Sequence, residues 1–191
     1  MAEAFKNDGS NTNNNDKMNE DLEAYDRLRR RIMWLIPNGI FMLGTKGLND
    51  LNLMTLSWMT QVAAEPKAVV ISCEINSLSY KNIKITKNFV VSILNKEDKK
   101  PAIVFAKPAV YDPIESTLSG FKFFKSENTG CPVISSAVAY LEFEVIESRE
   151  FESHAAIFAR VINAKELMEP GVKLTKEIIL SMQDTKMNYG G

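Results

Sequence analysis

The amino-acid sequence predicts a mainly β fold: a closed or nearly closed antiparallel barrel with peripheral helices. About six runs of strand length are rich in β-branched and aromatic residues. The connections between consecutive runs are short, which favours antiparallel pairing. No Gly-x-Gly-x-x-Gly follows a predicted strand, and its absence argues against a doubly wound, dinucleotide-binding sheet.

Composition limits the class of protein. The chain has 191 residues, enough for one sizeable core, and it is 45% hydrophobic and 25% charged, as in an average globular protein. A formal net charge of -1 gives no basic surface for nucleic acid. No apolar run approaches the roughly 18 residues of a membrane span, and the N-terminus lacks the apolar segment of a secretory signal. We expect a cytoplasmic protein that binds neither nucleic acid nor membranes.

The N-terminal region divides into a tail and a helix. Residues 1–18 are polar, Asn-rich and without hydrophobic periodicity, so we expect a disordered tail. An amphipathic helix over about 20–35 follows, packed onto the rest of the chain, because four apolar residues recur at helical spacing: Leu22, Tyr25, Leu28 and Ile32. Residues 19–191 are expected to form a single domain.

The remaining elements are predicted from runs of apolar residues and from the turn-forming residues that separate them. The expected strands cover residues 40–43, 52–60, 67–75, 88–94, 137–147 and 151–164. The last two should form a hairpin that turns at Ser148-Arg149. Helices are expected to start at Ser77 and to cover about 175–182. Residues 96–131 contain three prolines, which predicts irregular structure with a short helix.

Few residues suggest acid–base, nucleophilic or metal chemistry. Cys73 and Cys131 share no motif spacing, and with a single His in the chain they cannot complete a Cys/His zinc site. We expect free thiols in a reducing compartment and no metal. Glutamates at 142, 144 and 147 alternate along a strand and should face solvent. No catalytic side chain can be named.

The strand from Asn52 to Trp58 mixes neutral polar and apolar side chains, which suits a planar, mostly uncharged ligand. A flavin needs neutral donors and acceptors along its pyrimidine edge, and Thr55, Ser57 and backbone amides could supply them. It also needs apolar walls, which Met54 or Trp58 could provide. Taken without further information, the same residues favour a half-buried edge strand whose hydroxyls face water.

Two further features are open to a structural or a functional interpretation. A helix that starts at Ser77 or Ser79 offers unpaired N–H groups to a phosphate, with Lys81 or Lys84 adding charge, but such a serine is more often only an N-cap. His154 shares a strand face with Ala156, Phe158 and Arg160. This pattern predicts a partly exposed sheet histidine, and a donor beside a redox ring is the alternative.

The order of these motifs resembles the flavin reductase-like, FMN-binding split-barrel family. The resemblance rests on Asn-Leu-Met-Thr-Leu-Ser-Trp at 52–58, Glu65-Pro66, the apolar strand through Ser72-Cys73, the hydroxyl-capped helix at Ser79, Asn88-Phe89-Val90-Val91, Gly130-Cys131-Pro132-Val133 and the strand that contains His154. It covers most of the chain beyond the N-terminal tail and helix. Each motif is short, but their order and spacing agree.

The resemblance implies a six-stranded antiparallel Greek-key split barrel that forms a homodimer and binds FMN, less often FAD, near the dimer interface. The residues implied to line the isoalloxazine are Met54, Thr55, Leu56, Ser57 and Trp58, with Cys73 on the neighbouring strand. Those implied for the phosphate are Ser77, Ser79 and Lys81, and His154 would lie on the nicotinamide side. Two positions differ from many relatives: Ser77 replaces an arginine, and Glu152-Ser153-His154 replaces Gly-Asp-His.

The implied activity is that of an oxidoreductase that takes hydride from NADH or NADPH onto flavin and passes electrons to an acceptor. The flavin would carry the redox chemistry, which agrees with the scarcity of catalytic side chains. The main alternative is a non-catalytic FMN-binding electron carrier or flavin-binding module. A barrel without flavin is a third possibility.

Overall fold

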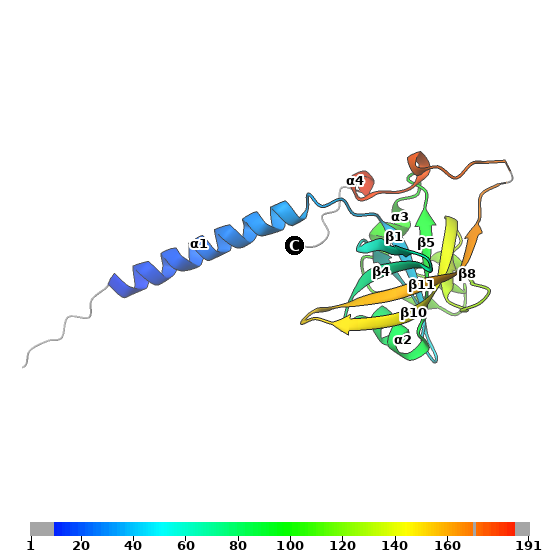
Figure 1. The fold of residues 1–191 in the computed structure, drawn as a ribbon, viewed down its shortest axis with the longest axis horizontal. Helices are drawn as coiled ribbons and strands as arrows, with labels where there is room; N and C mark the ends of the chain where they lie inside the picture. The colour runs from blue at the N-terminus through cyan, green and yellow to red at the C-terminus, as the bar shows by residue number, and fades with distance from the viewer. Residues whose placement is uncertain (1–9, 170, 186–191) are drawn as a thin grey trace, which may run out of the picture. The chain divides into compact units, whose positions relative to one another are not determined.

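The computed structural model describes residues 10–169 and 171–185 (Figure 1). The chain divides into two compact units, one that ends at Pro37 and a body that covers Asn38–Met187. Within the described residues, no helix has the length and apolar character needed to cross a membrane. The body contains every residue that the sequence predicts for a ligand site.

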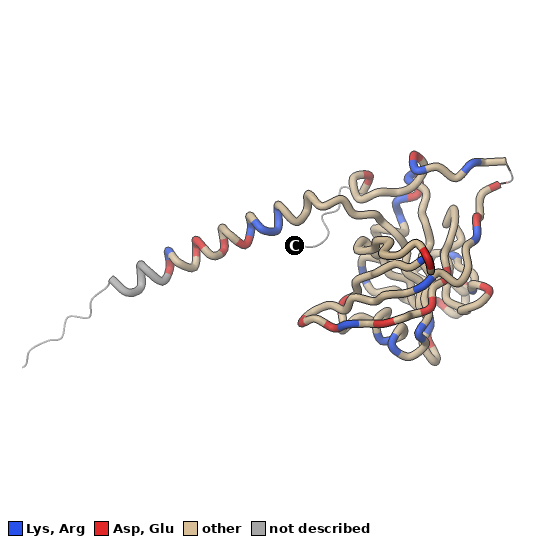
Figure 2. Tube along the Cα trace, viewed as in Figure 1, with Lys and Arg blue, Asp and Glu red and all other residues tan. Residues whose placement is uncertain are grey.

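The first unit contains helix α1, Ser10–Met33. The helix expected over about 20–35 therefore begins earlier, and residues 10–18, assigned to the tail, are helical, whereas 1–9 lie outside the described residues. Ion pairs within one turn support it, from Asp26 to Arg29 and Arg30 among others. Figure 2 shows its arginines following its acidic residues along the chain. Packing of this helix onto the body stays a prediction.

The body is built on a seven-stranded antiparallel sheet in the order β2-β1-β5-β10-β11-β4-β3. Its strands are β1 (Phe41–Lys46), β2 (Leu51–Leu56), β3 (Met59–Ala64), β4 (Lys67–Glu74), β5 (Asn88–Leu94), β10 (Ala137–Glu150) and β11 (His154–Glu166). Helix α2, Leu78–Thr86, connects β4 to β5. The mainly β, antiparallel architecture is therefore confirmed.

The strand expected over 52–60 is broken into β2 and β3, so the larger sheet has one strand more than expected. β2 pairs with β1, where Leu56 lies opposite Phe41, and β3 pairs with β4, where Met59 lies opposite Ile71. These partners place β2 and β3 at opposite edges of the sheet. The chain crosses from one edge to the other at Ser57-Trp58, a crossing that hydrophobic periodicity alone does not reveal.

Residues 96–131 contain more regular structure than expected. The short helix is present as α3, Lys100–Val104. A second sheet follows, made of β6 (Tyr111–Asp112), β7 (Thr117–Leu118), β8 (Phe121–Lys125) and β9 (Pro132–Ile134). β6, β7 and β9 have only two or three residues, too short to show a period of two, and the sequence did not predict these strands or β8.

Two expected boundaries near the C-terminus are wrong. Ser148 and Arg149 lie within β10, and the hairpin turns at 151–153, where Phe151 N–H donates to the His154 carbonyl at 2.7 Å. The helix expected over 175–182 is replaced by a 3₁₀ turn, Lys176–Ile178, and a short helix α4, Met182–Thr185. Between them, Leu180 N–H donates to the Leu94 carbonyl at 2.9 Å, so pairing with the end of β5 prevails over local helix formation.

The larger sheet has a hydrophobic core on each face, because neighbouring residues of a strand point to opposite sides. Met42 and Val90 belong to the first core, with Phe105, Val133 and Leu180. Leu43 and Val91 belong to the second, with Ile71, Phe143, Ile157 and the α2 residues Tyr80 and Ile83. At Gly44, a Cβ would lie 1.9 Å from the Pro132 carbonyl oxygen, so glycine is what lets β9 approach β1 this closely.

Candidate functional site

The crossing between β2 and β3 is held by backbone and hydroxyl contacts. Thr55 N–H donates to the Phe105 carbonyl at 3.0 Å, and Thr55 Oγ1 donates to the Ala102 carbonyl at 2.7 Å. The Thr55 hydroxyl thus donates its proton within the protein, in a hydrogen bond that holds α3 against β2. Ser57 is 3% exposed, and in the structure it sits where the chain leaves that edge.

Trp58 and His154 lie next to each other although 96 positions separate them in the numbering. Their ring centroids are 5.2 Å apart with planes at 52°. Ser72 N–H donates to the Trp58 carbonyl, and His154 lies opposite Glu74, so β4 sets both positions. Both side chains are half-buried, which confirms the prediction of a partly exposed sheet histidine. Together they form an aromatic surface beside the crossing.

Several of the apolar residues predicted for the site belong to the second core. Leu56 is 2% exposed and Cys73 is 1% exposed, and Met54 packs against the same cluster. Burial raises the pKa of the Cys73 thiol to about 12, so the thiol stays protonated. The side chains of Leu56 and Cys73 therefore pack in the core. Only the backbone groups of these two residues could contact a ligand bound outside the core.

The start of α2 brings together two of the three residues predicted for phosphate. Ser77 is the N-cap: its Oγ accepts from Tyr80 N–H at 3.2 Å and donates to the Glu74 carbonyl at 2.7 Å. Lys81 is exposed one turn further along the helix. Ser79, by contrast, is fully buried, and its Oγ accepts from Asn52 Nδ2 at 2.9 Å. Ser79 thus fixes α2 to β2.

Asn52 is a site residue that the sequence analysis did not single out. It is 7% exposed and belongs to β2, and its only side-chain partner among the described residues is Ser79. The sequence did contain a signal for this residue: an amide near the beginning of an apolar strand. If such an amide is buried, it needs a hydrogen-bond partner, because an unpaired polar group in the core is costly. Its contact places the N-terminus of α2 against the first half of β2.

The tip of the β10–β11 hairpin is tied to α2. Tyr80 Oη donates to Glu150 Oε1 at 2.6 Å, and Lys84 Nζ contacts the same oxygen at 3.0 Å. These hydrogen bonds, that from Tyr80 first, lower the pKa of Glu150. Burial and the neighbouring carboxylate raise the pKa of Tyr80 to about 12, so its proton stays in the bond. The contacts hold the hairpin tip that precedes His154, the first residue of β11.

One strand glutamate contradicts the expectation of solvent exposure. Glu142 is fully buried, and its carboxylate accepts hydrogen bonds from Asn128 N, Asn128 Nδ2, Thr129 N and Asn163 Nδ2 at 2.7 to 3.1 Å. A bulge next to Glu142 shifts the register against β11, and the loop before β9 closes over the carboxylate. This carboxylate is structural, because all its partners are neutral groups of the fold.

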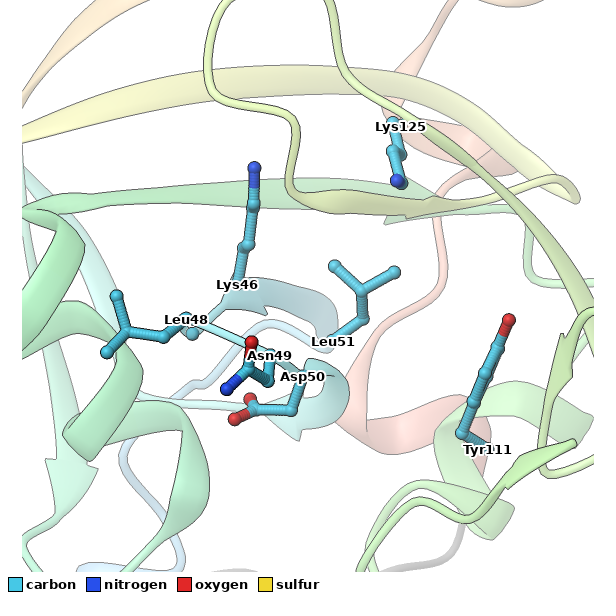
Figure 3. Close-up of a pocket in the computed structure, with 8 residues that line it drawn as sticks. Lys46, Leu48, Asn49, Asp50, Leu51, Tyr111 and Lys125 are labelled. Atoms are coloured by element: carbon cyan, nitrogen blue, oxygen red, sulfur yellow. The ribbon is translucent and has the colours of Figure 1, made fainter. Parts of the chain in front are cut away.

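A cavity of about 480 Å³ lies at the end of the β1–β2 hairpin (Figure 3). It is lined by Lys46, Gly47, Leu48, Asn49, Asp50, Leu51, Tyr111 and Lys125. None of the residues predicted from the sequence lines it, although Leu51 directly precedes Asn52. Three segments that are far apart in the sequence form the cavity, so no local sequence motif indicates it.

The arrangement suits binding of a planar, neutral ring by orientation rather than acid–base catalysis. In the described ranges no group of His, Cys, Asp and Glu is placed to hold a metal ion. The crossing offers backbone groups, the Trp58 ring offers an apolar wall beside the His154 ring, and the start of α2 offers N–H groups and a lysine for phosphate. Redox chemistry at this surface would have to come from a bound cofactor.

Comparison with known families gives a match over most of the body. The model of the family described as "Flavin reductase like domain" matches residues 33–176. The NADH-dependent FAD reductase of Streptomyces globisporus is 27% identical over 149 residues, which cover 76% of this chain and 79% of that protein. Diflavin flavoprotein A 1 of Synechocystis is 21% identical over 80% of this chain, which spans only 26% of that longer protein.

Solved structures resemble the body as well. The NADH:FAD oxidoreductase SgcE6 of Streptomyces globisporus C-1027 superposes with a TM-score of 0.64 at 26% identity, over 74% of this chain and 83% of that one. The same enzyme has been solved with NAD and FAD fragments. The styrene monooxygenase flavin reductase of Pseudomonas putida S12 has a TM-score of 0.61 at 24% identity, over 72% of this chain and 86% of its own, and supports the fold alone.

Proposed function

Because the chain belongs to the flavin reductase-like domain family, we propose that it is an oxidoreductase that takes hydride from NADH or NADPH onto a flavin and passes electrons to an acceptor. The observation that carries the proposal is the family match over 33–176, which includes both the β2–β3 crossing and the Trp58–His154 pair. When bound, the flavin supplies the acceptance and donation of hydride and electrons.

The residues at the crossing fit such a ring. Backbone groups around Ser57 are uncharged, as the pyrimidine edge requires, and the half-buried ring of Trp58 offers an apolar face. His154 would stand on the nicotinamide side, with its Nδ1 held 2.9 Å from Ser153 Oγ. In this proposal the protein orients two rings and excludes water, and no side chain transfers a proton.

The phosphate would bind at the start of α2. Ser77 caps the helix there, Lys81 adds a positive charge, and the helix dipole favours an anion. Ser79 would act indirectly, by holding Asn52 and thus β2 against this helix end. These residues serve the flavin, ribityl chain and first phosphate that FMN and FAD share. FMN itself remains the proposal made from the resemblance.

A homodimer is part of the proposal. Strands β3, β11 and β10 each contain a bulge, and the extra residue of each bulge is an exposed apolar side chain: Val62 at 47%, Ile162 at 41% and Ile146 at 57%. Half-buried Val70 and Phe158 lie opposite each other on the strands between β3 and β10. A second copy would cover these side chains. A reducing, cytoplasmic location is also proposed, supported by the two buried free thiols.

The test is the visible spectrum of the purified protein with added flavin, before and after anaerobic NADH or NADPH. We expect flavin to bind and to bleach with one of the two nicotinamides. Trp58→Ala should weaken flavin binding about tenfold, since an aromatic contact of this size contributes about 1 kcal/mol beyond its buried area. Trp34→Ala removes the second tryptophan of the chain, which lies outside the body, and should leave flavin binding and flavin bleaching unchanged.

The outcomes separate the candidate functions. Bound flavin that neither nicotinamide reduces would contradict the reductase and favour the non-catalytic electron carrier. Failure to bind any flavin would overturn the flavoprotein assignment of this chain.

A further inference from the structure

Helix α1 carries an exposed apolar stripe along one side. Five large side chains, each between 45% and 60% exposed, form this stripe: Met18, Leu22, Tyr25, Leu28 and Ile32. At about 100° and 1.5 Å per residue, they fall within about 120° of the helix circumference and extend over about 21 Å. An isolated helix is marginal in water, because most of its stability comes from packing of its apolar side. The stripe therefore favours a partner that covers it.

The order of residues in the stripe is symmetric about Tyr25. The five positions are spaced by four, three, three and four residues. Met18 and Ile32 each lie seven residues from Tyr25, and Leu22 and Leu28 each lie three residues from it. A two-fold axis at Tyr25 between antiparallel helices would thus place apolar residues of both copies at the same heights along the pair. A second copy of α1 is the partner that this pattern fits.

The charges of α1 favour the antiparallel over the parallel orientation. Its aspartates and glutamates precede its arginines along the helix (Figure 2). In a parallel pair, acidic residues would lie beside acidic residues and arginines beside arginines, and like charges side by side repel. In an antiparallel pair, the acidic half of each helix lies beside the arginine-rich half of the other. The charge pattern therefore selects the antiparallel pair.

One pair of opposite charges lies within the stripe. Asp21 and Arg29 each lie four residues from Tyr25, so the symmetric pairing places Asp21 of one copy at the height of Arg29 of the other. The Arg29 guanidinium lies over the Tyr25 ring at 5.3 Å, near the centre of the stripe, and contacts Asp26 at 2.5 Å. Asp21 forms no ion pair with any described residue. Because a guanidinium has five N–H donors, Arg29 can bind this second carboxylate as well.

The helix pair is too small to hold two copies together alone. A stable interface uses about 20–30 residues from each partner, far more than the apolar side chains of this stripe. The pair can form where the sheet face that exposes Ile146 already joins two copies, because the second helix is then present at an effective concentration of about millimolar. Helix pairing thus adds to the dimer and does not replace it.

We propose that α1 pairs with α1 of a second copy, antiparallel and centred on Tyr25, within the dimer described under the proposed function. The inference rests on that dimer and not on the flavin. It competes with packing of α1 onto the body, which is the other way to cover the stripe.

Disulfide cross-linking of the full chain tests the pairing, because the native Cys73 and Cys131 are buried. The double variant Asp21→Cys with Arg29→Cys should form covalent dimers on mild oxidation. Each single variant should yield at least about fivefold less, because two copies of either residue would lie about 12 Å apart along the pair, beyond the reach of a disulfide.

The matched control is the double variant Glu23→Cys with Arg27→Cys. These residues each lie two positions from Tyr25, so they too share a height in the pair, but they lie on the side of the helix opposite the stripe. This control should yield no more covalent dimer than the single variants.

Charge reversal provides a second readout. With Met18→Cys and Ile32→Cys as the cross-linked positions, adding Asp21→Arg should lower the yield about threefold, because it places two arginines at the same height. Adding Arg29→Asp as well should restore the yield.

The outcomes separate the possible partners of the stripe. Single variants that cross-link as well as the double variant would show a parallel pair and overturn the inference. Yields no higher than the control would overturn it in favour of a stripe covered by the body, and so would a charge reversal without effect. A monomeric parent protein in light scattering would overturn the dimer on which the inference rests, whereas failure to bind flavin would overturn the reductase alone.

Discussion

At the scale of single residues, Glu142 shows most clearly how hydrogen bonding can outweigh burial. Burial alone raises the pKa of this carboxyl, but hydrogen bonds from Asn163, Thr129, Ser126 and Asn128 more than offset that effect, and the pKa is lowered. The charged form is therefore the one that stabilises the fold. Its donors lie on the loop before β9 and on β11, which ties these segments to β10.

Stability should fall in acid because of this residue. A carboxyl whose pKa is lower in the folded than in the unfolded chain stabilises fully above the unfolded value, near 4.5, and that contribution disappears as pH falls through the folded pKa. We expect Glu142→Gln to reduce the free energy of unfolding by about 1–3 kcal/mol at pH 7. Urea denaturation between pH 7 and 3 should show the variant losing less stability than the parent as the pH falls.

Glu144 offers the matched control on the same strand. Its carboxylate pairs with Arg160 at 2.6 Å, but both side chains are about half exposed, so Glu144→Gln should cost less than about 1 kcal/mol. Equal losses for the two variants at pH 7 would show that the buried bonds of Glu142 contribute nothing special.

Residues of this kind mark the limit of sequence interpretation. Alternation along 137–147 correctly identified a strand, but it placed Glu142 in solvent because the bulge and the covering loop at Asn128-Thr129 leave no local pattern. The same limit applies to Ser79 and Cys73, whose burial depends on partners far away in the chain. By contrast, the cap at Ser77 and the outward position of His154 followed from neighbouring residues and were predictable.

At the scale of elements, the strand over 88–94 was predicted with the bounds that β5 has, and α2 was predicted by its start alone. Ser77 begins it as N-cap, and Lys87 ends it in the left-handed conformation, with φ of 59° and its N–H donated to the Ile83 carbonyl. The helix is central to the proposed flavin site because it meets β2 through Asn52 and Ser79 and the β10–β11 tip through Glu150.

Loss of the cap should loosen this helix end. We expect Ser77→Ala to lower the free energy of unfolding by about 1 kcal/mol, because the Tyr80 N–H loses its acceptor. Flavin affinity should fall as well if the helix end holds a phosphate. Chemical denaturation and flavin titration measure the two effects, with exposed Ser136→Ala as a control that should change neither. Unchanged stability of Ser77→Ala would contradict the capping role.

The elements that the sequence missed are those defined by tertiary pairing. The break at Ser57-Trp58 exists because β2 and β3 find partners at opposite edges of the sheet. The C-terminal segment stays extended around Leu180 because it pairs with the end of β5. In the first case the partners, β1 and β4, are neighbours in the chain but lie toward opposite edges of the sheet, and in the second the partner of Leu180 is the distant Leu94. Local propensity shows neither fact, and it gave one long strand in the first case and a helix in the second.

At the scale of the whole molecule, the class of fold and the family followed from the order of short motifs, whereas assembly rests on surface composition. The body buries two cores on one sheet but leaves the bulge residues Val62, Ile146 and Ile162 exposed. Such an apolar surface on a bulged sheet is typical of a face that another chain covers.

We therefore expect the protein to be a dimer that Ile146→Glu dissociates, because a charge at the interface would lose its hydration. Light scattering coupled to size exclusion measures the change. Ile114→Glu is the control, since Ile114 is 89% exposed in the loop between β6 and β7, away from the larger sheet. A monomeric parent protein, or a variant that remains dimeric, would show that another surface, or none, mediates assembly.

The crossing at Ser57-Trp58 has a mechanical consequence. The dipeptide joins β2 and β3, the two edge strands of the larger sheet. A molecule bound at the dipeptide would therefore contact both edges of the sheet. Such a ligand would have to dissociate before the two edge strands could separate. By mass action, the melting temperature of the protein should therefore rise with the ligand concentration. A flavin at this point would hold the barrel shut as well as carry electrons.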